Sequence, residues 1–205
     1  MKDTACHAQT MVFVSNKNAS IRKKIASLIF IIYWLIVFEG AFRKWIFPEY
    51  YQIIFFIRDP FVLLVYCYAI KGRFFEKNAF VLGAMMLSIL IIPVMIFHFL
   101  ENNVSIIVLA YGWRNYFFYI PLAFIIGKCF QENDIRIFIK HNLFVSLPMA
   151  ILVFIQFLSP PDAFINKGIK EDGFVFQVID GIVRTTGTFT FTAGYALYAG
   201  SIFAL

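Results

Sequence analysis

Charged residues are scarce in this sequence of 205 residues. Only 15% of them are Asp, Glu, Lys or Arg, whereas 61% are hydrophobic and 20% are aromatic. Soluble domains contain about 25% charged residues on average, so this chain has too little polar surface to cover a water-soluble globule. The composition therefore predicts an integral membrane protein.

Cysteine and histidine are also rare, with three residues of each. The cysteines show no C-x-x-C spacing, so neither a zinc site nor a disulfide framework is indicated. The formal charge of +6 is spread between apolar runs and does not form one basic stripe, which argues against a nucleic-acid partner. We expect no metal, no cofactor and no nucleic acid, and membrane lipids as the surroundings.

Long apolar runs define the expected fold. A helix needs about 20 apolar residues to cross a hydrocarbon core of roughly 30 Å. The first span is expected to begin at residue 25 and to end between residues 38 and 42. Further spans are expected at 53–70, 80–99, 106–130, 137–158 and 188–205. The fold class is therefore all-α: a polytopic bundle of about six transmembrane helices. The last run has no charged flank or cap before Leu205, which predicts that the chain is truncated within a helix.

Lysine and arginine indicate the orientation, because cytoplasmic loops carry an excess of both. With the amino terminus inside, the inner segments hold eleven of the 18 basic residues and the outer segments hold six. We therefore expect a cytoplasmic tail at 1–24, a transmembrane domain at 25–205 and an outer loop at about 159–187. The tail ends in Arg22-Lys23-Lys24 and no small-x-small cleavage site follows, as in an uncleaved signal anchor.

The turn between the first two spans concentrates charge among aromatic rings, which is typical of a membrane interface. It contains Glu39 and Arg43, and Arg58-Asp59-Pro60 follows inside the second span. Asp before Pro signals a helix start. Either the helix continues kinked through Pro60 or the chain enters the bilayer as an irregular segment. Both alternatives place Arg58 and Asp59 below the outer surface of the membrane. There Arg58 either snorkels toward water while paired with its neighbour, or forms part of a substrate-binding site.

A second deep arginine, Arg114, lies in the fourth span. An arginine at a helix centre costs about 2.5 to 3.5 kcal/mol on insertion scales, so Arg114 should face a cavity or a partner, with Asp59 and Glu39 as candidates. A structural ion pair explains it as well as a ligand contact does. Near the sixth span, Arg184 precedes Gly187 and Thr188. Amides at a helix start, hydroxyls and an arginine can bind a phosphate, although a threonine that only caps the helix fits equally.

Four segments together resemble the amino-terminal half of the O-antigen ligase and O-antigen polymerase superfamily. They are residues 39–45 (EGAFRKW), 58–60 (RDP), 111–117 (YGWRNYF) and 184–189 (RTTGTF). Their order and spacing against the spans carry the resemblance, which covers most of residues 25–205. It implies an all-helical protein of the bacterial inner membrane that acts without a metal.

Membership would imply transfer of a glycan from undecaprenyl diphosphate to an acceptor on the periplasmic side, in surface polysaccharide assembly. The resemblance implies that arginines hold the diphosphate of the donor, here Arg43, Arg58, Arg114 and Arg184. Thr188 would add its hydroxyl at the expected helix start, and Glu39 and Asp59 would support the arginines as ion-pair partners. The family's catalytic arginine and histidine lie in a later loop, beyond Leu205, so no catalytic residue is assigned. Glycosyltransferase activity is expected only of a full-length protein.

Two other functions also fit these residues. Intramembrane ion pairs and outer arginines would suit a transporter for an anionic solute, whose halves are often repeated and contain interrupted helices. No clear repeat is visible within residues 1–205. In a non-catalytic membrane scaffold the charges would only fix the contacts between helices. The donor, the acceptor and the choice between ligase and polymerase are left open by the sequence.

Overall fold

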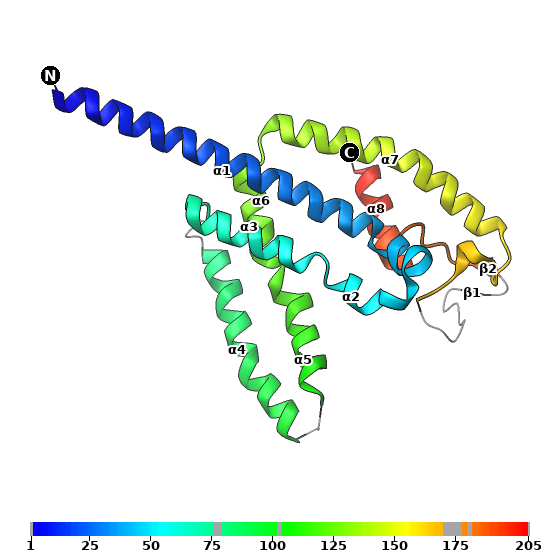
Figure 1. Ribbon diagram of the computed structural model, residues 1–205. Coiled ribbons are helices and arrows are strands. Elements are labelled where there is room, and N and C mark those ends of the chain that lie inside the picture. Colours follow the sequence, from blue (N-terminus) through cyan, green and yellow to red (C-terminus); the bar gives the residue numbers. More distant parts are fainter. Residues whose placement is uncertain (1, 76–78, 102–103, 170–177, 180–181, 205) are drawn as a thin grey trace. The chain divides into compact units, whose positions relative to one another are not determined.

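Helices form nearly all of the regular structure in the computed structural model, which describes residues 2–75, 79–101, 104–169, 178–179 and 182–204 (Figure 1). The longer helices are α1 (Lys2–Ala41), α3 (Asp59–Gly72), α4 (Ala79–Glu101), α6 (Ile120–Cys129), α7 (Glu132–Leu158) and α8 (Thr192–Phe203). The shorter elements are η1 (Phe42–Ile46), η2 (Pro48–Tyr50), α2 (Tyr51–Phe55), α5 (Ile106–Trp113), η3 (Arg114–Phe118), η4 (Phe164–Asn166), β1 (Val178–Ile179) and β2 (Ile182–Val183).

The predicted all-α membrane bundle is confirmed. Among the described residues, four helical segments are long and apolar enough to cross a membrane: Asn18–Ile46, Pro48–Gly72, Ala79–Glu101 and Glu132–Leu158. They correspond to the first, second, third and fifth predicted spans. The fourth predicted span is instead divided into α5, η3 and α6, and the sixth begins as a helix at Thr192, four residues later than expected.

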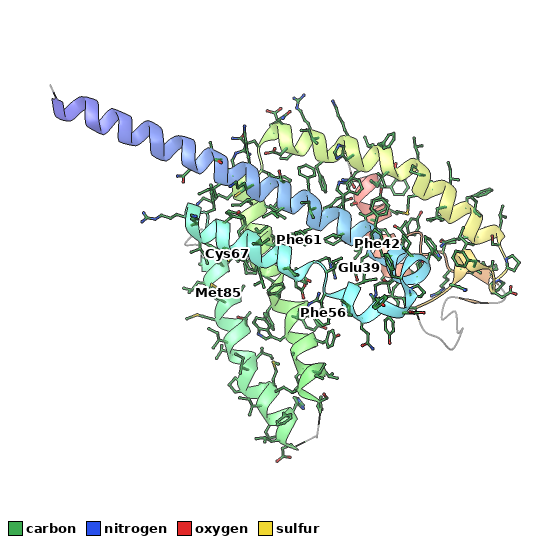
Figure 2. The ribbon with its side chains drawn as sticks, in the orientation of Figure 1. Glu39, Phe42, Phe56, Phe61, Cys67 and Met85 are labelled. Atoms are coloured by element: carbon green, nitrogen blue, oxygen red, sulfur yellow. The ribbon has the colours of Figure 1, made fainter. Side chains whose placement is uncertain are left out.

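The break in the second predicted span falls where the sequence signalled it. Helix α2 ends at Phe55, residues 56–58 form a turn, and α3 starts at Asp59 with Pro60 as its second residue. Pro60 has no N–H to donate, so it fits the first turn of a helix but not its interior. Of the two alternatives for this segment, the structure has the interrupted one. Figure 2 labels Phe56 in this turn.

The chain divides into two compact units, each described here by itself. The first unit comprises Met1–Ile29 and Val62–Phe130. Its buried residues recur at helical spacing, as Ile21 and Ile25 do on α1 and Val62, Val65 and Ala69 on α3. Helices α4 and α5 lie side by side (Figure 1). A hydrogen bond of 3.0 Å from Trp113 Nε1 to the Ser88 carbonyl joins them.

Much of α4 is exposed within the first unit. Leu82, Met85, Leu87 and Leu90 are each more than half exposed, and Figure 2 labels Met85 on this helix. A helix that is hydrophobic all round must be covered by protein or by lipid. Lipid contact along α4 accounts for its composition and fits the membrane setting.

The second unit comprises Phe30–Phe61 and Gln131–Leu205. Its core joins α1, α7, α8 and the segment before α8 through Val37, Met149, Phe189 and Tyr198. Buried Asn142 of α7 accepts a hydrogen bond from the Tyr33 hydroxyl on its side chain and one from the Tyr198 hydroxyl on its carbonyl. These polar contacts fix the register of three helices inside an apolar core.

The predicted outer loop contains a short antiparallel pairing that the sequence did not predict. Val178 pairs with Val183 and Ile179 with Ile182, so that β1 and β2 form a two-stranded ladder. Residues 170–177 and 180–181 of the predicted loop lie outside the described residues. The loop then continues directly into residues 184–191, which we call the Gly187 loop.

Candidate functional site

Three of the four motif segments meet in the second unit around the end of α1. Glu39, on the last turn of α1, is only 6% exposed. Its Oε1 lies 3.2 Å from Arg43 Nη1 and its Oε2 lies 2.9 Å from Arg58 Nε. Figure 2 labels Glu39 close to Phe42, where α1 passes into η1. We call Glu39, Arg43 and Arg58 the Glu39 cluster; its formal net charge is +1.

Both arginine side chains of the cluster are slightly more exposed than the carboxylate that pairs with them. The side chain of Arg43 is 11% exposed and that of Arg58 is 17% exposed, against 8% for Glu39. Arg43 also lies over the Phe55 ring, 5.1 Å from its centroid, and its Nη1 is 3.5 Å from Thr190 Oγ1. The carboxylate and the ring hold both arginines in position, and planar guanidinium groups suit an anion such as phosphate.

Arg43 belongs to η1, a π-helical turn, as does its neighbour Lys44. Lys44 is 4% exposed, and its Nζ donates to Thr186 Oγ1 and to the Gly187 carbonyl, each at 2.9 Å. Among the described residues Lys44 forms no ion pair with a carboxylate. Its buried ammonium thus raises the formal charge at the end of α1 to +2 when added to that of the Glu39 cluster.

The Gly187 loop is fixed against α7 by Gln156, which is 1% exposed. Gln156 Oε1 accepts from the backbone N–H of Thr186 at 3.2 Å and of Gly187 at 2.8 Å. Its Nε2 donates to the Ile165 carbonyl at 3.0 Å and to the Gly187 carbonyl at 3.3 Å. Gly187 has a φ of +56°, which a residue with a side chain rarely adopts.

Gly40 permits the loop to reach α1. A Cβ built on Gly40 would collide with backbone atoms of Thr188, Phe189 and Thr190. The Thr188 hydroxyl donates to the Val37 carbonyl of α1, at 2.6 Å. The contact between residues 39–45 and residues 184–189 is therefore made by backbone against backbone, and it is closed by hydrogen bonds from Lys44, Gln156 and Thr188.

The structure brings only some of the predicted site residues together. Glu39, Arg43 and Arg58 form the cluster, and Asp59 follows Arg58 as the first residue of α3. Arg184 is exposed. Thr188, in the Gly187 loop, is buried against α1. Its contact with substrate stays a prediction.

The helix start expected at Thr188, on which the predicted phosphate site was based, lies later in the chain. Helix α8 begins at Thr192, after an extended Phe191, and not at Thr188. Within the Gly187 loop, the N–H groups of Thr186 and Gly187 are bonded to Gln156. These two amides hold the loop instead of facing an anion.

Arg114 lies in the first unit and is 8% exposed, as its depth in the span predicted. It begins η3, the second π-helical turn, and donates to Asn115 Oδ1 at 3.1 Å. Its guanidinium carbon lies 5.5 Å from the centroid of the Tyr119 ring. Irregular π turns occur often at functional sites because they reposition side chains, and two of the predicted arginines lie in such turns. The predicted pairing of Arg114 with Glu39 or Asp59 stays a prediction.

No protein-family model, curated protein or solved structure matches this chain. Among the described residues no group of three His, Cys, Asp or Glu is placed to hold a metal ion.

Two residues with central contacts were missed by the sequence reasoning. Lys44 lies inside the EGAFRKW segment, where the sequence alone does not distinguish its role from that of the adjacent Arg43. Gln156 lies within an apolar run, Phe-Ile-Gln-Phe-Leu, which hides it in the sequence. A polar side chain inside a membrane span is expensive unless it is hydrogen-bonded, and that rule would have identified Gln156.

We expect Gln156→Leu to lower the free energy of unfolding by about 2 kcal/mol, because the buried N–H groups of Thr186 and Gly187 lose their acceptor. The measurement is the loss of the folded, monodisperse protein on heating in detergent, monitored by size-exclusion chromatography. The matched control is Gln52→Leu, since Gln52 is exposed and its amide donates a hydrogen bond to the hydroxyl of the adjacent Tyr51. Equal stability of the two variants would contradict the assigned role of Gln156.

Proposed function

We propose that this chain is a bacterial inner-membrane glycan ligase-like or polymerase-like protein with a cytoplasmic amino terminus. It would bind an oligosaccharide linked to undecaprenyl diphosphate and act in the assembly of surface polysaccharide. The observation that carries the proposal is the Glu39 cluster, in which Arg43 and Arg58 are both held by one buried carboxylate at the end of a membrane helix. The resemblance of the four motif segments supports the choice of substrate.

The chemistry of the cluster suits a diphosphate. A guanidinium binds phosphate oxygens through two parallel N–H bonds, and arginines already held in place lose little entropy on binding. Transfer of the glycan releases the lipid diphosphate, on which negative charge develops. Fixed positive groups near it stabilise that leaving group in the transition state. Arg43 and Arg58 are therefore assigned to donor binding and leaving-group stabilisation, and the acid-base step is assigned to no residue of this chain.

The proposal predicts weaker binding of undecaprenyl diphosphate when either arginine is lost. Arg43→Gln and Arg58→Gln should each weaken binding about tenfold or more, because each removes a charge-assisted contact worth about 1.5 to 3 kcal/mol. The purified protein is incubated with radiolabelled undecaprenyl diphosphate in detergent, and the lipid retained per protein is counted. Arg136→Gln is the matched control, since Arg136 only pairs with Glu132 on the surface.

The same experiment separates the enzyme from its main rival. A carrier for anionic solutes is favoured by the interrupted helix between α2 and α3, a feature of many transporters. If the chain is such a carrier, inorganic pyrophosphate at the same concentration as the labelled lipid should displace it. Retention of the label under excess pyrophosphate supports a lipid-linked donor. If both arginine variants bind the lipid as tightly as wild type does, the assignment of Arg43 and Arg58 to donor binding is wrong.

A further inference from the structure

A groove between α1 and α3, within the first unit, is lined by basic, hydroxyl and apolar side chains. Its volume is about 420 Å³. Ser20, Lys23, Lys24 and Ser27 line it from α1. These residues recur at three- and four-residue spacing, so they share one helix face. None of the described residues that line the groove is acidic, so this wall presents two ammonium groups and two hydroxyls without a carboxylate.

The α3 side of the groove is largely apolar. Leu64 and Tyr68 of α3 line it, one helical turn apart, and Leu28 continues the α1 face beyond Ser27. Lys24 Nζ lies 5.7 Å from the centroid of the Tyr68 ring, so the ammonium group of one wall is near the aromatic ring of the other. The lining therefore changes from basic to apolar over about two helical turns, or roughly 11 Å.

The position of this change matches a membrane interface. Lys23 and Lys24 stand near the start of the candidate span Asn18–Ile46, and Tyr68 stands near the end of the candidate span Pro48–Gly72. Lysine and tyrosine are enriched at the level of the lipid head groups, while leucine belongs to the hydrocarbon level. A ligand that fills the groove must carry a negative charge at the lysines and an apolar chain at the leucines.

We propose that this groove binds an anionic phospholipid of the leaflet at the amino-terminal end of α1. The phosphate contacts Lys23, Lys24 and the Ser20 hydroxyl, and one acyl chain lies along Leu28 and Leu64. The site is distinct from the Glu39 cluster, which belongs to the second unit, and the proposal does not depend on the function assigned to that cluster. Bound lipid would fill the space between α1 and α3 and hold the two helices together.

The test uses native mass spectrometry of the purified protein in detergent with added phosphatidylglycerol. Lys23→Gln/Lys24→Gln should weaken retention of the lipid about 30-fold, since each lysine near an anionic lipid contributes about 1 kcal/mol and 1.4 kcal/mol is a factor of ten. The matched control, Lys71→Gln/Arg73→Gln, removes two charges from the carboxyl-terminal end of α3 without touching the groove lining. Its retention should change less than threefold.

A second pair of variants tests the apolar part and keeps the charge constant. Leu64→Trp fills the groove and should reduce retention about tenfold, whereas Leu63→Trp, at a similarly exposed neighbouring position that does not line the groove, should not. Equal losses in both double charge variants, or in both tryptophan variants, would overturn the proposal. So would retention of phosphatidylcholine equal to that of phosphatidylglycerol, or displacement of the lipid by millimolar inorganic phosphate, which would assign the lysines to a soluble anion.

Discussion

Gly40→Ala is expected to lower the free energy of unfolding by about 3 kcal/mol or more. Overpacking a tight site costs about 1 to 3 kcal/mol when side chains can move aside. The atoms that a Cβ on Gly40 would meet belong to the backbone of Thr188, Phe189 and Thr190, which cannot rotate away. The loop must shift as a whole, and the bonds from Lys44, Gln156 and Thr188 are weakened together.

The measurement is the melting temperature of the purified protein in detergent. For a chain of this size about 2 to 4 °C is lost per kcal/mol, so Gly40→Ala should melt about 6 to 12 °C lower. Gly83→Ala and Gly127→Ala are matched controls, because both glycines are helical and a Cβ on either meets nothing within 4 Å. Helical Gly to Ala changes are stabilising by about 1 kcal/mol, so the controls should melt slightly higher. A Gly40 variant as stable as these controls would contradict the close approach of loop and helix.

Much of the fold could be predicted because span formation depends on local properties. Length and apolarity identify the candidate spans that contain α1, α3, α4 and α7, and Asp59-Pro60 marks the start of α3. The start of α8 was placed too early because Gly187 and Thr188 look like a helix start in sequence. Their backbone and side-chain groups are bonded to Gln156 and Val37, which are distant in sequence, so no local pattern could reveal them.

The site was predictable in part for the same reason. Charges inside apolar runs identified Glu39, Arg43 and Arg58 singly, and the structure adds that one carboxylate holds both arginines. The meeting of residues 39–45 with residues 184–189 depends on Gly40, whose missing side chain carries no signal in a single sequence. Lys44 is oriented by a π-helical turn, which residue spacing at 3.6 per turn does not anticipate.

Glu39→Gln should affect stability and ligand binding in opposite directions. The variant keeps the shape of the side chain but leaves Arg43 and Arg58 without their buried carboxylate, which should destabilise the protein by about 3 kcal/mol. Adding Arg58→Gln should recover part of that loss, because the two substitutions share one ion pair and contacting residues couple by about 0.5 to 3 kcal/mol. Glu132→Gln, which breaks only an exposed pair, is the matched control.

Binding should move the other way because the cluster's formal charge rises from +1 to +2 when Glu39 loses its charge, and we expect this gain to exceed the entropy lost in ordering the two freed arginines. If a diphosphate occupies the Glu39 cluster, undecaprenyl diphosphate should raise the melting temperature of Glu39→Gln more than that of wild type, since the stabilisation by a ligand in excess grows with the logarithm of its affinity. A purely structural ion pair gives the loss of stability without this rescue. Destabilisation that excess diphosphate leaves unchanged would therefore assign Glu39, Arg43 and Arg58 to helix contacts, and a Glu39 variant as stable as wild type would remove even that role.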